Sequence, residues 1–420
     1  MQMYSNVINS FPTFFSRVVY WELKQTFFMI IRLMLFGQLA QGTYRKELTK
    51  LIKRQFPVLE CIALESGSNA IEVALGAFKQ LDPSRSRVLI PVYICPSVIR
   101  AVKRAGLTPC FTAVSNDLTL IPEDLQRKLN ADTLAVIIPH IYGYAAQISE
   151  CVQLIRQAAP SVFIIDDAAA AFGINVQNRP LGSWGDVGIF SFGPSKQLTA
   201  TGGGMLLISN TDVLRVVQEC VAAIPEPSET ETLLKVLRFW RDFICIRYSP
   251  ALNYWGKKFL KITPRSYRSW NLKKMSNIDA ALVLWLLNHK QCIHTRRNQI
   301  IEYYIRELSK LPAVSFPQEN ASTFGVSRFY MRTSGYSVER NQQGEIVRDN
   351  PLVAYLRSRG IQAGYGYAVL EDDLGREGEQ LRKERHAWFN ELVWLPIDHT
   401  KDLACYETVI NAITSFFNVS

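Results

Sequence analysis

Short apolar segments alternate with segments of helical periodicity along much of this chain, and this alternation limits the fold more than any other feature. Apolar runs at 58–64, 88–91, 134–139 and 162–167 predict strands, and helical spacing follows the first of them over 70–80. Short connections between unlike elements are typical of a mostly parallel sheet covered by helices on both faces. The sequence therefore predicts an α/β fold, in which ligands bind at the carboxyl ends of the strands.

The alternation covers only part of the 420 residues, and a chain of this length favours more than one domain. We expect an apolar helical segment over 1–41 and a large α/β domain over 42–225. An aromatic-rich helical connection over 226–275 should follow, and then a smaller C-terminal α+β domain over 276–420. Helical periodicity over 277–311 opens that last domain.

The first segment raises the question of a membrane. Residues 27–39 read FFMIIRLMLFGQL, and Arg32 interrupts the run, so it falls short of the ~20 apolar residues of a spanning helix. We expect this helix to pack on the body of the protein or on a partner subunit. A helix lying on a membrane surface, helped by Arg17, Lys24 and Arg32, is the alternative.

Composition and charge exclude several classes of protein. A hydrophobic share of 48% and a charged share of 20% argue against a disordered or fibrous chain. The net charge of +10 suits an anionic substrate, but no basic stripe with interleaved aromatics predicts a nucleic-acid partner. The eight cysteines are scattered and form no CxxC pair, which indicates reduced thiols in a cytoplasmic protein. No spacing of histidines and cysteines predicts a metal site.

One lysine lies in a turn built from small residues. The run SFGPSKQLTATGGG over 191–204 places Lys196 shortly after an apolar strand at 187–190. A lysine held in this way can form a Schiff base with a carbonyl group. Most lysines in glycine-rich loops are merely solvated, so this run alone does not establish a site.

Two consecutive acids end the apolar strand upstream of that lysine. Asp166 and Asp167 close the run VFIIDD. Side chains alternate along a strand, so only one of the two can face a site. We predict that Asp167 does so and that Asp166 is a structural hydrogen-bonding group. A buried carboxylate needs a partner such as a protonated pyridine nitrogen. That carboxylate and a Schiff-base lysine are what pyridoxal phosphate chemistry needs.

A candidate anion site lies between the first strand and its helix, in the run Ser66-Gly67-Ser68-Asn69. Glycine allows a phosphate to approach the backbone closely, and the N–H groups at the start of a helix attract an anion. Serine and asparagine also cap helices that bind no ligand. Taken alone, this run favours a plain helix cap over an anion site.

The order and spacing of four runs resemble the motifs of the DegT/DnrJ/EryC1/StrS family of sugar aminotransferases. These runs are SGSNAIEVALGAF, VLIPVYICPSVIRAVKRAG, IDDAAAAFG and SFGPSKQLTATGGGML. The likeness extends from about Gly42 to the C-terminus, with residues 225–270 matching poorly. It implies the fold-type I architecture of pyridoxal-phosphate-dependent transferases, pyridoxal 5'-phosphate as the cofactor, and a homodimer whose active sites are shared between subunits.

The resemblance also implies roles for individual residues. Lys196 matches the catalytic Schiff-base lysine, and Asp167 matches the partner of the pyridine nitrogen. The resemblance implies that further residues bind the cofactor. They belong to the loop that holds the phosphate, to a serine that follows a strand, and to a strand end that covers the cofactor ring. In that order they are Gly67, Ser68 and Asn69, then Ser191, then Tyr93 and Cys95.

Three positions depart from the family's pattern. The family usually has an aromatic residue where Cys95 stands, and we expect Tyr93 to substitute because residues i and i+2 share a strand face. The family usually has Gln or His beside the phenolic oxygen of the cofactor, where Ala170 cannot donate a hydrogen bond. Gly193 replaces a common His.

The resemblance implies transfer of an amino group from an amino acid, with glutamate as the expected donor, to a keto group of a nucleotide-linked sugar. This would serve nucleotide-sugar, polysaccharide or secondary-metabolite biosynthesis. One alternative is a non-catalytic or regulatory protein with a degenerate cofactor site, suggested by Ala170 and Cys95; another is a related enzyme with a non-sugar substrate. A sugar dehydratase of the same family is disfavoured, because those members carry His where Lys196 stands.

Overall fold

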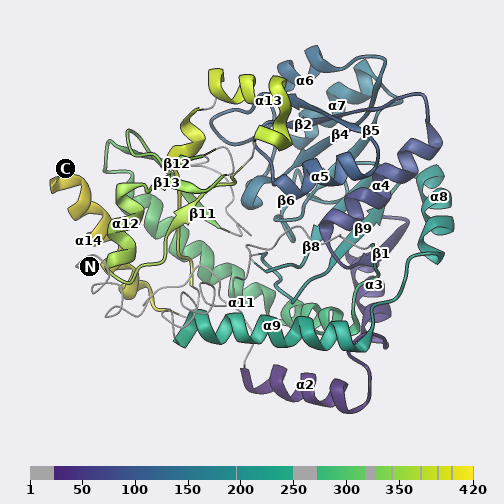
Figure 1. Cartoon of the computed structure of the whole chain (residues 1–420), viewed down its shortest axis with the longest axis horizontal. Helices are drawn as coiled ribbons and strands as arrows, with labels where there is room; N and C mark the ends of the chain where they lie inside the picture. Colours follow the sequence, from purple (N-terminus) through teal and green to yellow (C-terminus); the bar gives the residue numbers. More distant parts are fainter. Residues whose placement is uncertain are drawn as a thin grey trace.

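Seven strands form the central sheet of the computed structural model, in the spatial order β1-β9-β8-β5-β4-β2-β3 (Figure 1). They are β1 (Glu60–Leu64), β2 (Arg87–Pro91), β3 (Thr108–Thr112), β4 (Thr133–Pro139), β5 (Phe163–Asp167), β8 (Val187–Ser191) and β9 (Gly204–Ile208). Strands β8, β5, β4, β2 and β3 run parallel, whereas β9 pairs antiparallel with both β8 and β1. The prediction of a mostly parallel α/β sheet is confirmed.

The structure describes most of the chain. The described residues are 23–194, 196–248, 272–316, 328–341, 344–368, 371–385, 387–398 and 401–419. Predictions that concern residues 1–22 and 249–271, Arg17 among them, therefore lie outside the described residues.

Helices cover both faces of the central sheet. Strand β4 is buried at every residue, as expected for a strand covered on both faces. Its Ile137 joins one apolar cluster, together with side chains of α4 (Gly67–Leu81), α5 (Pro96–Arg104) and α8 (Thr211–Ala222). Val136 and Ile138 join a second cluster on the opposite face, with α3 (Tyr44–Gln55), α6 (Pro122–Lys128) and α7 (Ile148–Ala158).

One long helix connects the central sheet to a second, smaller sheet. Helix α11 (Asn277–Leu308) has 32 residues and matches the predicted periodicity closely. Its first half packs in the second apolar cluster, and its last turns pack in the first cluster with the small sheet. That sheet has the order β10-β11-β15-β14 and is antiparallel. Its strands are β10 (Val314–Ser315), β11 (Phe329–Thr333), β14 (Gly364–Tyr365) and β15 (Leu392–Leu395).

Helices α12 (Pro351–Ser358) and α14 (Leu403–Val419) pack together beside the small sheet, whereas α13 (Glu371–Arg385) reaches back to β3 and α5 of the large one. The remaining short elements are η1 (Ile141–Gly143), β6 (Asn175–Val176), β7 (Arg179–Pro180), β12 (Glu339–Arg340), β13 (Ile346–Arg348) and η2 (Ala387–Glu391).

Two helices lie side by side at the lower edge of Figure 1, α2 (Leu23–Leu35) and α9 (Glu229–Tyr248). The side chains of Ile30 and Leu33 in α2 are buried in the second apolar cluster, the one that contains Val136 and Ile138. Just beyond α2, the backbone N–H groups of Leu39 and Ala40 donate to the Glu229 carboxylate at 3.1 and 2.9 Å. One face of α2 therefore packs on the body of the protein.

The opposite face of α2 is apolar as well. Phe28, Leu35 and Phe36, the last just beyond the helix, are between 63% and 75% exposed. Among the described residues, no helix combines the length and the apolar character that crossing a membrane requires.

Candidate active site

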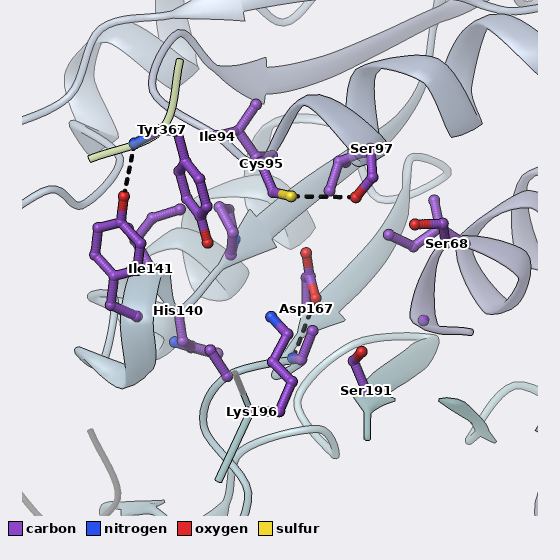
Figure 2. A pocket seen from close by; sticks show the side chains of 17 residues that line it. Ser68, Ile94, Cys95, Ser97, His140, Ile141, Asp167, Ser191, Lys196 and Tyr367 are labelled. Atoms are coloured by element: carbon purple, nitrogen blue, oxygen red, sulfur yellow. Dashed lines mark hydrogen bonds between the residues drawn. The ribbon is translucent and has the colours of Figure 1, made fainter. Parts of the chain in front are cut away.

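A pocket lies at the carboxyl ends of the central parallel strands, where the sequence predicted a ligand site (Figure 2). Its walls come from the start of α4, the segments after β2 and β4, the ends of β5 and β8, the lysine loop, and Tyr367 from the segment after β14. Most of the residues predicted to hold the cofactor line this pocket: Gly67, Ser68, Cys95, Asp167, Ser191 and Lys196. The structure does not bring Asn69 and Tyr93 to its wall.

The two acids at the end of β5 face different surroundings, as strand alternation predicts. Asp167 lines the pocket, where its carboxylate accepts a hydrogen bond from the N–H of Ala169 at 3.2 Å. Asp166 is fully buried, and it accepts from Nε2 of His140 at 2.8 Å. Asp166 also accepts from the N–H groups of Gly182 at 2.6 Å and Trp184 at 3.0 Å. Asp166 therefore has a structural role.

Asp167 is suited to a cationic ligand. Burial raises the pKa of Asp167 above its usual value, and the positive charge of Lys196 and the N–H of Ala169 oppose that rise without cancelling it. A buried carboxylate is costly unless it is paired. The N–H of a protonated pyridine ring would supply both a charge and a hydrogen-bond donor.

Lys196 lies in the loop between β8 and β9, and its amine points into the pocket near Asp167 (Figure 2). The loop is held by its own hydrogen bonds. The N–H of Lys196 donates to the carbonyl of Gly193 at 3.1 Å, and the carbonyl of Lys196 accepts from the Thr199 hydroxyl at 2.6 Å. The lysine is thus presented to the pocket by a structured turn.

A buried acid on α11 anchors the rest of this loop. Asp279 accepts from the Thr201 hydroxyl at 2.5 Å and from the N–H of Gly202 at 3.1 Å, and Lys235 of α9 lies 2.6 Å from it. Burial acts to raise the pKa of Asp279, but the charge of Lys235 and these hydrogen bonds hold it below its usual value. Neither Asp279 nor Lys235 is among the residues predicted from the sequence. Asp279 had a signal, because it stands three residues after the N-cap Ser276, but such a spacing indicates only a cap.

The start of α4 both caps its helix and faces the pocket. Ser66 is the N-cap, and its hydroxyl accepts from the N–H of Asn69 at 3.1 Å and donates to the Asn69 side chain at 2.8 Å. Asn69 is therefore turned toward Ser66 and not toward the pocket. A Cβ atom at Gly67 would lie 3.0 Å from the Cβ of Ser191, so a larger residue would crowd this corner. First-turn N–H groups lack acceptors within their helix and attract anions.

The expectation that Tyr93 covers the cofactor in place of an aromatic at Cys95 is wrong. Strand β2 ends at Pro91, so strand alternation does not continue to these two residues. Tyr93 is 1% exposed, and its hydroxyl lies 2.7 Å from that of Tyr142 and accepts from the N–H of Tyr367 at 3.0 Å. Tyr93 instead supports the wall of the pocket from behind.

The pocket residues fit pyridoxal phosphate. The start of α4 and Ser191 offer an anion site, Asp167 a partner for a pyridinium nitrogen, and Lys196 an amine for its aldehyde. Within the ranges that the structure describes, no cluster of His, Cys, Asp and Glu side chains could hold a metal ion.

Comparisons with known proteins agree with this chemistry. The model of the DegT/DnrJ/EryC1/StrS aminotransferase family matches residues 24–414. The chain is 25% identical over 325 residues to a GDP-perosamine synthase of Vibrio cholerae, covering 77% of this chain and 76% of that protein. It is 30% identical over 156 residues to a UDP-N-acetyl-3-dehydro-alpha-D-glucosamine 3-aminotransferase of Acidithiobacillus ferrooxidans, covering 37% of this chain and 41% of that one.

Solved structures share the fold. PseC of Helicobacter pylori, an aminotransferase involved in the biosynthesis of pseudoaminic acid, superposes with a TM-score of 0.73 at 14% identity, covering 97% of this chain and 100% of that one. DesV of S. venezuelae, solved with a ketimine intermediate, gives 0.71 at 20% identity, with 97% and 98% covered. The family match over nearly the whole chain and the pocket chemistry agree, so this chain belongs to the DegT/DnrJ/EryC1/StrS aminotransferase family and is a pyridoxal-phosphate-dependent enzyme.

Proposed function

We propose that this enzyme transfers an amino group from an amino acid, with glutamate as the expected donor, to a keto group of a nucleotide-linked sugar. The observation that carries the proposal is that Asp167, Lys196 and the start of α4 converge on one pocket. The names of the relatives support a sugar acceptor, since a GDP-linked and a UDP-linked sugar occur among them. The net charge of +10 suits an anionic nucleotide sugar.

Each pocket residue has a proposed task. Asp167 pairs with the protonated pyridine nitrogen, Gly67, Ser68 and Ser191 hold the phosphate, and Lys196 attaches the cofactor covalently. The bound cofactor supplies an electron sink that stabilises a carbanion at the donor carbon. Lys196, once released from the attachment, carries the proton from the donor carbon as a general base and returns it as a general acid.

The attachment can be tested directly. The enzyme with bound cofactor should absorb visible light, and the absorbance should shift when glutamate is added. Borohydride reduction and mass spectrometry should find the cofactor on the peptide that contains Lys196. Lys196→Ala should abolish the label and the transamination while the circular dichroism stays unchanged. Lys79→Ala, which removes a half-buried lysine that lies outside the pocket and donates to the carbonyls of Pro83 and Arg85, is the control. A label on another lysine would contradict the assignment.

We further propose that the enzyme is a cytoplasmic homodimer with shared active sites, acting in nucleotide-sugar, polysaccharide or secondary-metabolite biosynthesis. The family resemblance supports the dimer. We also propose a division of the chain into segments 1–41, 42–225, 226–275 and 276–420, because the central sheet uses only residues 60–208 and the small sheet only residues 314–395. Light scattering should give the mass of a dimer; a fully active monomer would exclude shared sites.

A regulatory protein that binds the cofactor without turnover is the second candidate. Cys95 and Ala170 line the pocket at positions where the family usually has an aromatic residue and a hydrogen-bond donor. The chain is also 26% identical over 197 residues to a protein of Geobacillus stearothermophilus named pleiotropic regulatory protein. This candidate predicts a visible absorbance that does not change with any amino donor.

A further inference from the structure

One end of the pocket lacks the hydrogen-bond donor that the cofactor needs. In pyridoxal phosphate, the ring carbon that carries the reactive aldehyde is flanked by the phenolic carbon on one side and by the carbon that carries the phosphate arm on the other. With the phosphate at Ser68 and Ser191, the phenolic oxygen must point away from these residues, toward the opposite end of the pocket. Ala170 offers only a methyl group to the pocket.

Tyr367 occupies that opposite end. Its side chain enters the pocket beside Cys95, and its hydroxyl points into the space that His140, Lys196 and Asp167 surround (Figure 2). Ser68 and Ser191 lie on the other side of that space. The Tyr367 hydroxyl thus faces the region where the phenolic oxygen belongs.

The backbone of Tyr367 is held in place by two tyrosines. Its N–H lies 3.0 Å from the hydroxyls of both Tyr93 and Tyr142. Its ring packs on theirs, with centroids 5.7 Å from Tyr93 and 4.6 Å from Tyr142. Such support keeps the Tyr367 ring in one orientation and so fixes the direction of its hydroxyl.

The Tyr367 hydroxyl is available as a donor. Within the part of the chain that the structure describes, it makes no hydrogen bond. The other polar groups at this end are already engaged. Nε2 of His140 bonds to Asp166, Nδ1 of His140 accepts from the N–H of Ala146 at 3.0 Å, and the Tyr142 hydroxyl is bonded to Tyr93. A ligand that places an acceptor at this end of the pocket would pair with this hydroxyl.

We propose that Tyr367 donates a hydrogen bond to the phenolic oxygen of the cofactor and so replaces the donor that Ala170 cannot provide. This inference rests on the placement of the cofactor under the proposed function. Tyr367 is then a catalytic residue supplied by the C-terminal part of the chain, in direct contact with the cofactor.

Tyr367→Phe removes only the hydroxyl and tests this role. The Kd for pyridoxal phosphate, measured by equilibrium dialysis, should rise about tenfold, because a hydrogen bond to a charged oxygen is lost. The pH at which the visible absorbance of the bound cofactor changes should rise by about one unit, since the phenolic oxygen then holds the neighbouring proton more tightly. Tyr365→Phe, two residues earlier on β14, removes a hydroxyl that does not line the pocket and should change neither value.

The melting temperature of the cofactor-free protein separates a ligand contact from a structural role, and Tyr367→Phe should leave it unchanged. Unchanged Kd and pH dependence in Tyr367→Phe would overturn the proposal, as would equal effects in Tyr365→Phe. If either of these results overturns the role of Tyr367 but borohydride reduction still labels Lys196 in these proteins, the proposed function stands. If the parent enzyme carries no label on Lys196, the proposed function fails and this inference fails with it.

Discussion

Replacing each of the consecutive acids of β5 by its amide should change the stability of the cofactor-free enzyme in opposite directions. At Asp166 one carboxylate oxygen faces Nε2 of His140, and the other faces the N–H groups of Gly182 and Trp184. Nδ1 of His140 accepts from the N–H of Ala146, which assigns the ring proton to Nε2. All three neighbours of Asp166 are therefore donors. In Asp166→Asn the amide NH₂ must face a donor in either orientation.

The expected loss for Asp166→Asn follows from these contacts. At least one buried donor loses its acceptor, at a cost of about 1–3 kcal/mol, and the new NH₂ group is left without a partner as well. We therefore expect the free energy of unfolding to fall by about 2–4 kcal/mol. For a domain of this size the melting temperature falls by roughly 2–4 °C per kcal/mol, so a drop of roughly 5–15 °C should be measured.

Asp167→Asn should behave in the opposite way. Burial raises the pKa of Asp167, so the folded protein holds that proton more tightly than the unfolded chain does. The stability that protonated Asp167 contributes is fully present below its unfolded pKa and is lost as the pH rises through its folded pKa. Above both pKa values, the charged carboxylate destabilises the cofactor-free fold. The neutral amide escapes this penalty. Cofactor-free Asp167→Asn should melt above the parent at pH 7, and the difference should vanish below about pH 4.

Calorimetry of the cofactor-free proteins at neutral and acid pH measures both effects, and transamination assays complete the comparison. At a temperature where both variants are folded, Asp167→Asn should lose far more transamination activity than Asp166→Asn. The reason is that a neutral amide at position 167 no longer stabilises the pyridinium form of the cofactor. Equal melting temperatures for the two variants, or equal losses of activity, would refute the reasoning from strand alternation.

Two further predictions concern segments outside the pocket. Lys235→Met should lower the free energy of unfolding by about 3–5 kcal/mol in a urea titration, because it leaves the buried charge of Asp279 without its ion-pair partner; an unchanged midpoint would contradict this. Deleting residues 1–35 should lower the melting temperature, since Ile30 and Leu33 are buried, and leave cofactor binding intact. Co-sedimentation of the full-length protein with vesicles would favour the membrane-surface alternative for α2.

The central sheet could be predicted because its strands are continuous apolar runs bounded by turn residues. A continuous apolar run does not indicate whether its strand is parallel or antiparallel to its neighbours. The run GMLLI of β9 is buried at every residue, and nothing in it shows that β9 enters antiparallel between β8 and β1. The ends of β5 and β8 could nonetheless be assigned to one site, because both strands belong to the parallel part of the sheet.

Other site residues could not be predicted, because side chains far apart in the sequence place them. Tyr93 looked like a ring-covering residue only as long as β2 was assumed to continue past Pro91. Asp279 looked like part of a helix cap, and its bonds to the lysine loop arise because the first turn of α11 lies against that loop. Tyr367 follows a strand of only two residues, too short for any periodicity to assign a face.

A site that takes a residue from the C-terminal part is complete only when that part is docked on the central sheet. Arg100 of α5 holds Asp373 of α13 through two hydrogen bonds, at 3.2 and 2.7 Å. The N–H of Tyr330 in β11 donates to the hydroxyl of Tyr144 at 3.3 Å, next to the pocket wall. These contacts join the C-terminal part to a helix and a loop of the large α/β part, and the Tyr93 and Tyr142 hydroxyls hold the backbone of Tyr367 at the pocket. Since a ligand stabilises the state that binds it, a cofactor that contacts Tyr367 should in turn stabilise this docked arrangement.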